Sequence, residues 1–107
     1  MKNTMRASLV LAAVAALACA MGFAQSSGEA IYKQKCQNCH GPDGMANSGI
    51  GKVMKVKPVN DPEVKKLTEA EMIEIALNGK GKMQSWKNEL TNAQIKGAVD
   101  YFRTFIK

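Results

Sequence analysis

Three segments of the chain carry apolar residues at the spacing of a helix. The clearest pattern lies near the C-terminus, where apolar residues recur at i, i+3, i+4, i+7 and i+11: Ile95, Ala98, Val99, Phe102 and Ile106. That spacing places them on one face, as in a helix with a single buried stripe. Shorter runs of the same kind predict a helix over residues 28–37 and another that begins near residue 68.

Helix-start signals agree with this pattern. Thr68 stands three residues before Glu71, and Thr91 stands three residues before Gln94. Each pair is a capping box, in which the hydroxyl and the later side chain satisfy backbone N–H groups that the first turn leaves unpaired. Gly79 supplies a stop signal for the second helix.

Residues 41–66 are predicted to form an irregular connection. This segment is rich in glycine and proline, which excludes a long regular element there. The one strand-like run, over residues 53–59, is broken by Pro58. The fold class is therefore predicted to be all-α.

The first 24 residues are predicted to be a secretory signal peptide. Lys2 and Arg6 form a basic start, residues 7–20 are small and aliphatic, and polar residues follow after residue 24. The apolar stretch is too short and too rich in alanine to indicate a membrane span. Cleavage after Ala24 leaves one mature domain, residues 25–107.

Three alternatives for this leader stay open. Cleavage after Ala20 also suits the small-residue rule, and the segment could remain as an uncleaved anchor helix. Cys19 could carry a lipid, although Leu17 stands closer to it than a lipoprotein motif requires. We expect a periplasmic protein with no stable membrane insertion after cleavage, and the membrane-anchored form is not excluded.

Size and charge narrow the class of protein further. The full chain has 107 residues and a formal net charge of +6. Loss of the leader removes Lys2 and Arg6 but none of the nine acids, so the mature charge is about +4. Moderate charge and export both argue against nucleic-acid binding. A domain this small gains little stability from an apolar core alone, so a staple or cofactor is expected.

Cys36, Cys39 and His40 carry the strongest chemical signal in the chain. They form the sequence C-x-x-C-H, the attachment motif for haem c. Two thiols on one helical turn can each bond one haem vinyl group, and the adjacent imidazole can then bind the iron. His40 is the only histidine, so a zinc site would lack ligands. A thioredoxin-like motif would need a βαβ pattern, and a short-loop disulfide would leave His40 unexplained.

The sixth iron ligand is sought among the methionines that follow the motif. Met45 is too near His40 to reach the opposite haem face, and Met72 belongs to a helix where core packing is expected. Met83 lies in an irregular stretch between two helices and is the preferred ligand. Met54 is a second candidate, and Met83 could instead fill a gap in the core.

These residues together resemble small bacterial class I cytochromes c. The resemblance covers residues 28–107 and rests on three segments: C-x-x-C-H at 36–40, a Gly-containing stretch that ends at Met83, and V-x-Y-h-R at 99–103, where h is apolar. It implies a cytochrome c fold round one covalently attached haem c. It also implies an electron carrier rather than an enzyme.

The resemblance assigns further roles to particular residues. Gly28 and Tyr32 on the first helix are expected to pack against Ala98 and Tyr101 on the last, with Gly28 allowing close backbone approach. It also implies that the Pro58 carbonyl accepts the Nδ1 proton of the haem-binding histidine.

Two further residues bear on the ligand loop. Trp86 is expected to pack against the haem, although a plain core or surface role is an alternative. Gln84 stands where the family usually has proline after the axial methionine, which puts the rigidity of the ligand loop in doubt.

The partners are expected to be redox proteins with acidic docking patches. The chain itself is expected to be a monomer. Exposed lysines should surround the haem edge and steer such encounters: Lys52, Lys55, Lys57, Lys80, Lys82 and Lys87. Two other classes stay open. One is a ligand-binding or sensor haem protein with an open or labile sixth position, and the other is a module that serves one redox complex.

Overall fold

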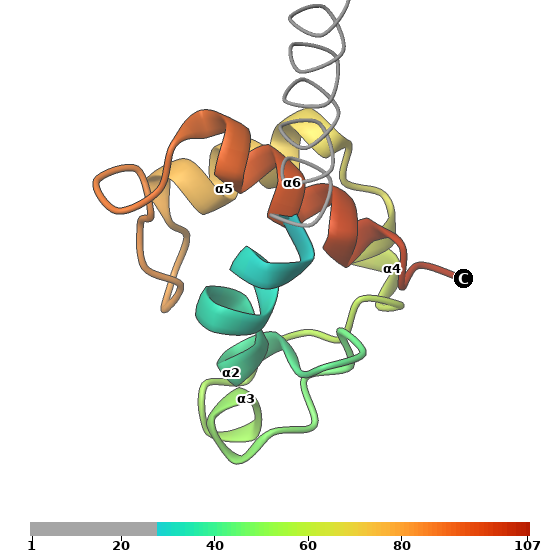
Figure 1. Ribbon diagram of the computed structural model, residues 1–107. Coiled ribbons are helices and arrows are strands. Elements are labelled where there is room, and N and C mark those ends of the chain that lie inside the picture. The colour runs from blue at the N-terminus through green and yellow to red at the C-terminus, as the bar shows by residue number, and fades with distance from the viewer. Residues whose placement is uncertain (1–27) are drawn as a thin grey trace, which may run out of the picture.

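The computed structural model describes residues 28–107, which form short helices joined by loops (Figure 1). Residues 28–31 are helical and lead without a break into the elements that follow. These are η1 (Tyr32–Cys36), α2 (Gln37–His40), α3 (Gly49–Val53), α4 (Pro62–Lys65), α5 (Glu69–Asn78) and α6 (Asn92–Arg103). No strand is present in this part of the chain, so the all-α prediction is confirmed. The predicted leader and its cysteine, Cys19, lie outside the described residues.

The first helix is longer than the sequence pattern indicates. It was expected to end at residue 37, but the chain stays helical through His40 by way of the wider π-type turn η1. Gly41 then ends it with φ 82°, a conformation that glycine adopts without strain. The whole C-x-x-C-H motif therefore lies at the C-terminal end of one continuous helical segment.

Side-chain caps explain why the other helices begin where they do. Thr68 and Thr91 form the two predicted capping boxes, with the expected reciprocal hydrogen bonds at both positions. In the predicted loop, Ser48 caps α3, and Asp61 caps α4 just before its first residue, Pro62. Both helices are short, as the glycine and proline content of the segment requires.

The first helical segment crosses α6 through two glycines. A Cβ added to Gly28 would lie 2.5 Å from the carbonyl oxygen of Gly97, which shows that the two backbones are in direct contact. Next to this contact, the ring centroids of Tyr32 and Tyr101 are 5.2 Å apart. The predicted approach of Gly28 and Tyr32 to the last helix is thus confirmed. Gly97, which the sequence pattern did not single out, provides the other half of the contact.

We predict that Gly28→Ala destabilises the folded protein by about 2 kcal/mol, because the added methyl group must push the two helices apart. The melting temperature of the haem-loaded protein should fall by roughly 10 °C. Gly49→Ala is the matched control, since no atom lies within 4 Å of its added Cβ. If both variants melted at the same temperature, the glycine contact would not stabilise the fold.

The apolar core lies where α5 and α6 pack together. It contains Met72, Leu90, Ile95 and Val99, all of them buried. Phe102 and Ile106, from the same predicted stripe, are half-buried and pack against this cluster. Within residues 28–107, none of the helices has the length and hydropathy needed to cross a membrane.

Candidate functional site

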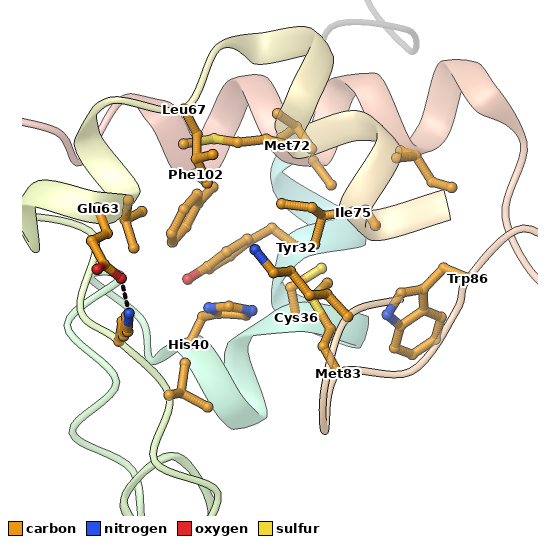
Figure 2. A pocket seen from close by; sticks show the side chains of 18 of the residues that line it. Tyr32, Cys36, His40, Glu63, Leu67, Met72, Ile75, Met83, Trp86 and Phe102 are labelled. Atoms are coloured by element: carbon orange, nitrogen blue, oxygen red, sulfur yellow. Dashed lines mark hydrogen bonds and ion pairs between the residues drawn. The ribbon is translucent and has the colours of Figure 1, made fainter. Parts of the chain in front are cut away.

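A cavity of about 520 Å³ opens between the first helical segment, α4 with the loops on either side of it, α5, the loop after α5, and α6. Its size suits a cofactor or a comparably large ligand. Figure 2 shows Cys36, His40, Met83 and Trp86 arranged round this hollow from separate segments of the chain. The structure therefore brings four of the six predicted site residues to one cavity.

The C-x-x-C-H turn is held in place by the loop that follows it. The Ser48 hydroxyl donates to the Asn38 carbonyl at 2.6 Å, and the Ala46 amide donates to the His40 carbonyl at 2.8 Å. Gly51 lies so close that an added Cβ would be 2.5 Å from the Cys39 carbonyl oxygen. These contacts fix the end of α2, and none of them was visible in the sequence pattern.

Burial keeps Cys36 and His40 neutral. Desolvation, with a smaller effect of the neighbouring Cys39, raises the pKa of the Cys36 thiol to about 11. Desolvation also lowers the pKa of His40 below its usual value of 6.5. At neutral pH Cys36 is therefore a thiol and His40 a neutral imidazole, the form that binds metals. Cys36 and Cys39 are both free of disulfide bonds.

The predicted hydrogen bond between His40 and Pro58 is not present in the structure. The buried Nδ1 atom of His40 has no hydrogen-bond partner among the described residues. The Pro58 carbonyl instead accepts from the Asp61 amide at 2.9 Å, in the turn that leads into α4. The His40 ring is packed edge-on against Phe102, with 5.3 Å between ring centroids. Phe102, expected only as a core residue, thus packs directly on the site histidine.

Geometry separates the four candidate methionines. Met83 and Met72 both line the cavity, whereas Met54 and Met45 are not among its lining residues. Met72 is only 7% exposed, which agrees with its predicted core role. Its sulfur lies 3.7 Å from the Arg103 guanidinium. The Met45 sulfur lies 3.6 Å from the Asn60 amide nitrogen. Met83 is therefore the methionine that faces the cavity without such a contact to its sulfur.

The Met83 loop is ordered by hydrogen bonds rather than by proline. Lys80 and Met83 exchange two backbone hydrogen bonds, of 2.9 and 3.1 Å, which close a tight turn. Gly79 and Gly81 on either side of Lys80 adopt positive φ values of 79° and 56°. Backbone hydrogen bonds therefore order this turn, although Gln84 stands where the family usually has proline.

The far end of this loop is fastened to α5. The Trp86 amide donates to the Ala76 carbonyl at 3.0 Å, and the Ser85 hydroxyl donates to the Leu77 carbonyl at 2.5 Å. The Trp86 side chain is half-buried, lines the cavity and packs against the core cluster. The core role considered for Trp86 is therefore confirmed, and its packing against a haem stays a prediction that its place in the cavity lining supports.

Tyr32 has the packing role expected of it. Its side chain is 1% exposed, and its hydroxyl donates to the Gly41 carbonyl at 2.6 Å. Its ring also lines the cavity next to Phe102, with 6.1 Å between the two centroids. Tyr32 thus ties the start of the helical segment to the turn that follows His40.

Charged side chains stand at one edge of the cavity. Lys57 and Glu63 form an ion pair there, and Lys66 and Lys80 also line this edge. The Lys57 ammonium lowers the pKa of Glu63, with a smaller effect from Lys66. The rest of the lining is mostly apolar, so the cavity combines an apolar interior with a basic edge.

The residues present fit a covalently attached haem. Two free cysteines lie one turn apart, a half-buried neutral imidazole adjoins them, and a thioether faces the same mostly apolar cavity. Nowhere in residues 28–107 do three or more His, Cys, Asp or Glu side chains cluster as a site for a bare metal ion. Cys36, Cys39, His40 and Met83 are thus the residues that would hold the group.

Comparison with known proteins agrees with this geometry. A family model described as cytochrome c oxidase, cbb3-type, subunit III matches residues 23–102. A solved structure, the KustC0563 c-type cytochrome, is similar with a TM-score of 0.68 and 30% sequence identity, over 75% of this chain and 98% of that one. No curated protein matches the chain. The likeness of fold and sequence confirms the predicted cytochrome c fold. The chain therefore belongs to the cbb3-type cytochrome c oxidase subunit III family and is a small c-type cytochrome.

Proposed function

We propose that the chain is a periplasmic electron carrier in which Cys36 and Cys39 attach one haem c, and His40 and Met83 bind its iron. The observation that carries the proposal is the single cavity that Cys36, His40 and Met83 share. A bound haem supplies the one-electron couple of its iron.

The chain's own residues then have three tasks. His40 and Met83 would both bind the iron of an attached haem, so that no coordination position would be left for a substrate. The mostly apolar lining would keep water away from the iron and so help to set its reduction potential. The turn closed by Lys80 and Met83 would hold the thioether in position.

The lysine-rich surface supports the proposal that the partners are acidic redox proteins. All six lysines expected round the haem edge are exposed, and two of them, Lys57 and Lys80, line the edge of the cavity. Uneven positive charge of this kind steers the chain toward carboxylate-rich surfaces. It favours short-lived complexes between a monomer of this chain and its partner.

The family name favours a second, narrower candidate. The matching family is described as a subunit of a cbb3-type cytochrome c oxidase. On this candidate the chain delivers electrons to one terminal oxidase rather than moving freely between partners. Co-purification with an oxidase would favour this narrower role, whereas recovery as a free monomer would favour the diffusing carrier.

One experiment tests the main proposal. The full chain is expressed with c-type maturation machinery, and the periplasmic fraction is examined by mass spectrometry and visible spectroscopy. We expect a mature chain that begins at Gln25 with one haem added, and a low-spin spectrum with the weak long-wavelength band of sulfur-to-ferric-iron ligation. A high-spin spectrum that changes with carbon monoxide would instead support a sensor or ligand-binding haem protein.

A further inference from the structure

Among residues 28–107, the two large hydrophobic side chains that are exposed both lie on helix α3. Ile50 is 54% exposed and Val53 is 76% exposed. Because they stand three residues apart on one helix, they occupy the same face. Single apolar residues on a surface need no explanation, but two neighbours on a rigid face form a patch.

The segment that carries this patch has charges of one sign. Residues 44–60 contain Lys52, Lys55 and Lys57 and no acidic residue. Lys52 and Lys55 are exposed, and no ion pair to another described residue is formed by either. Lys55 lies two residues beyond the end of α3 and adopts a left-handed conformation, with φ 56°. The patch is thus apolar at its centre with unpaired positive charge beside it.

The inner side of α3 rests on the helix that bears the haem-binding motif. Gly51 lies against the Cys39 carbonyl, and the Ser48 hydroxyl links the two helices by donating to Asn38 and accepting from the Gly51 amide at 2.9 Å. Figure 1 shows α3 beside α2, at the end of the molecule away from α5 and α6. The exposed face of α3 is therefore one helix away from the Cys39 attachment point.

We propose that the α3 face, formed by Ile50 and Val53 with Lys52 and Lys55 beside them, is the docking surface for a redox protein whose own apolar patch is rimmed by carboxylates. The proposal rests on the electron-carrier function proposed above. Charge complementarity selects this partner: a second copy of the chain would bring like charges together, and the lysines match carboxylates. Two apolar side chains on a five-residue helix are also too little for stable insertion into a lipid surface.

The two kinds of side chain have separable effects on docking. Lys52 and Lys55 raise the rate of encounter, and salt screens that effect. Ile50 and Val53 lose water on contact and lengthen the life of the complex at any salt concentration. The rigid link through Ser48 and Gly51 keeps the docked partner at a fixed position relative to α2.

The test measures electron transfer from the ferrous, haem-loaded chain to an acidic blue-copper protein, plastocyanin, by stopped-flow spectroscopy at several salt concentrations. One electron leaves the ferrous chain and reduces Cu(II) to Cu(I). We expect Lys52→Glu with Lys55→Glu to lower the second-order rate constant about tenfold at low salt, and little at high salt. Ile50→Ser with Val53→Ser should lower it about fivefold at every salt concentration.

A matched charge change provides the control. Lys35→Glu with Lys107→Glu alters the net charge by the same amount at two exposed positions outside the six lysines expected round the haem edge, and should change the rate less than threefold. If this control had the larger effect, or if both α3 variants reacted like the parent protein, docking would not occur on α3. A loss of binding to phosphatidylglycerol vesicles in Ile50→Ser with Val53→Ser, with an unchanged rate, would point to a membrane surface and overturn the proposal.

The same preparations distinguish failure of this inference from failure of the proposed function. Ferricyanide at high salt oxidises a ferrous carrier without specific docking, so its rate should be equal in all variants. A chain that ferricyanide oxidises normally, but whose α3 variants match the parent with plastocyanin, remains an electron carrier with a different docking surface. A ferrous chain that ferricyanide does not oxidise would contradict the carrier function itself.

Discussion

Replacing Cys36 and Cys39 together by serine is expected to abolish covalent haem and leave the mature chain unfolded. The two thiols are the covalent anchors in the haem motif, and the cavity beside them measures about 520 Å³. The cavity is open to solvent, so without haem its mostly apolar lining would be exposed to water instead of being buried. A domain whose free energy of folding is only about 5–15 kcal/mol tolerates such a loss poorly.

Haem-stained denaturing gels and far-ultraviolet circular dichroism measure the two parts of this result. Cys19→Ser is the matched control: it removes the third cysteine of the chain and should leave haem content and helicity unchanged. Recovery of a helical, cooperatively melting protein without haem from the Cys36→Ser, Cys39→Ser variant would contradict the view that the cofactor completes the core.

The helices could be predicted from the sequence because their signals are local. A threonine with Glu or Gln three residues later satisfies the first turn of a helix wherever it occurs, and both Thr68 and Thr91 do so in the structure. The stripe that begins at Ile95 faces the core for the same reason, since helix periodicity alone fixes which residues share a face.

Contacts between distant segments could not be predicted in the same way. Gly97 is a poor helix former within α6, and only the crossing of Gly28 shows why a side chain would not fit there. In the sequence, Ser48 is not distinguished from other polar loop residues. In the structure its hydroxyl caps α3 and also donates to the Asn38 carbonyl. Such roles depend on which backbone lies opposite, and spacing along the chain carries no information about that.

In the candidate site, too, local features could be predicted from the sequence and contacts between distant segments could not. C-x-x-C-H places the two cysteines and the histidine next to one another along the chain, so the sequence alone was sufficient to predict them as the haem-binding residues. The preference for Met83 over Met54 gained its structural support only from the cavity, which Met83 lines and Met54 does not. The Pro58 prediction came from resemblance alone, and in this chain the Pro58 carbonyl is engaged by the Asp61 amide.

Met83→Ala is expected to open the sixth iron position while leaving the haem attached. Met83 faces the cavity, whereas the sulfur of Met72, the other methionine there, lies against Arg103. Loss of the thioether should abolish the weak long-wavelength band, produce a high-spin ferric spectrum and allow carbon monoxide to bind the ferrous form. The reduction potential should fall by a sizeable part of the roughly 0.8 V range that axial ligands span.

The variant should stay folded, because the turn round Met83 is closed by backbone hydrogen bonds with Lys80 that alanine retains. Visible spectra, carbon monoxide titration and a potentiometric titration on the same sample measure the three effects. Met54→Ala is the matched control and should keep the parent spectrum and potential. If Met54→Ala lost the long-wavelength band while Met83→Ala retained it, the ligand assignment would be reversed. If neither lost it, the sixth ligand would be Met72 or Met45, and the Arg103 or Asn60 contact to its sulfur would have to break when haem binds.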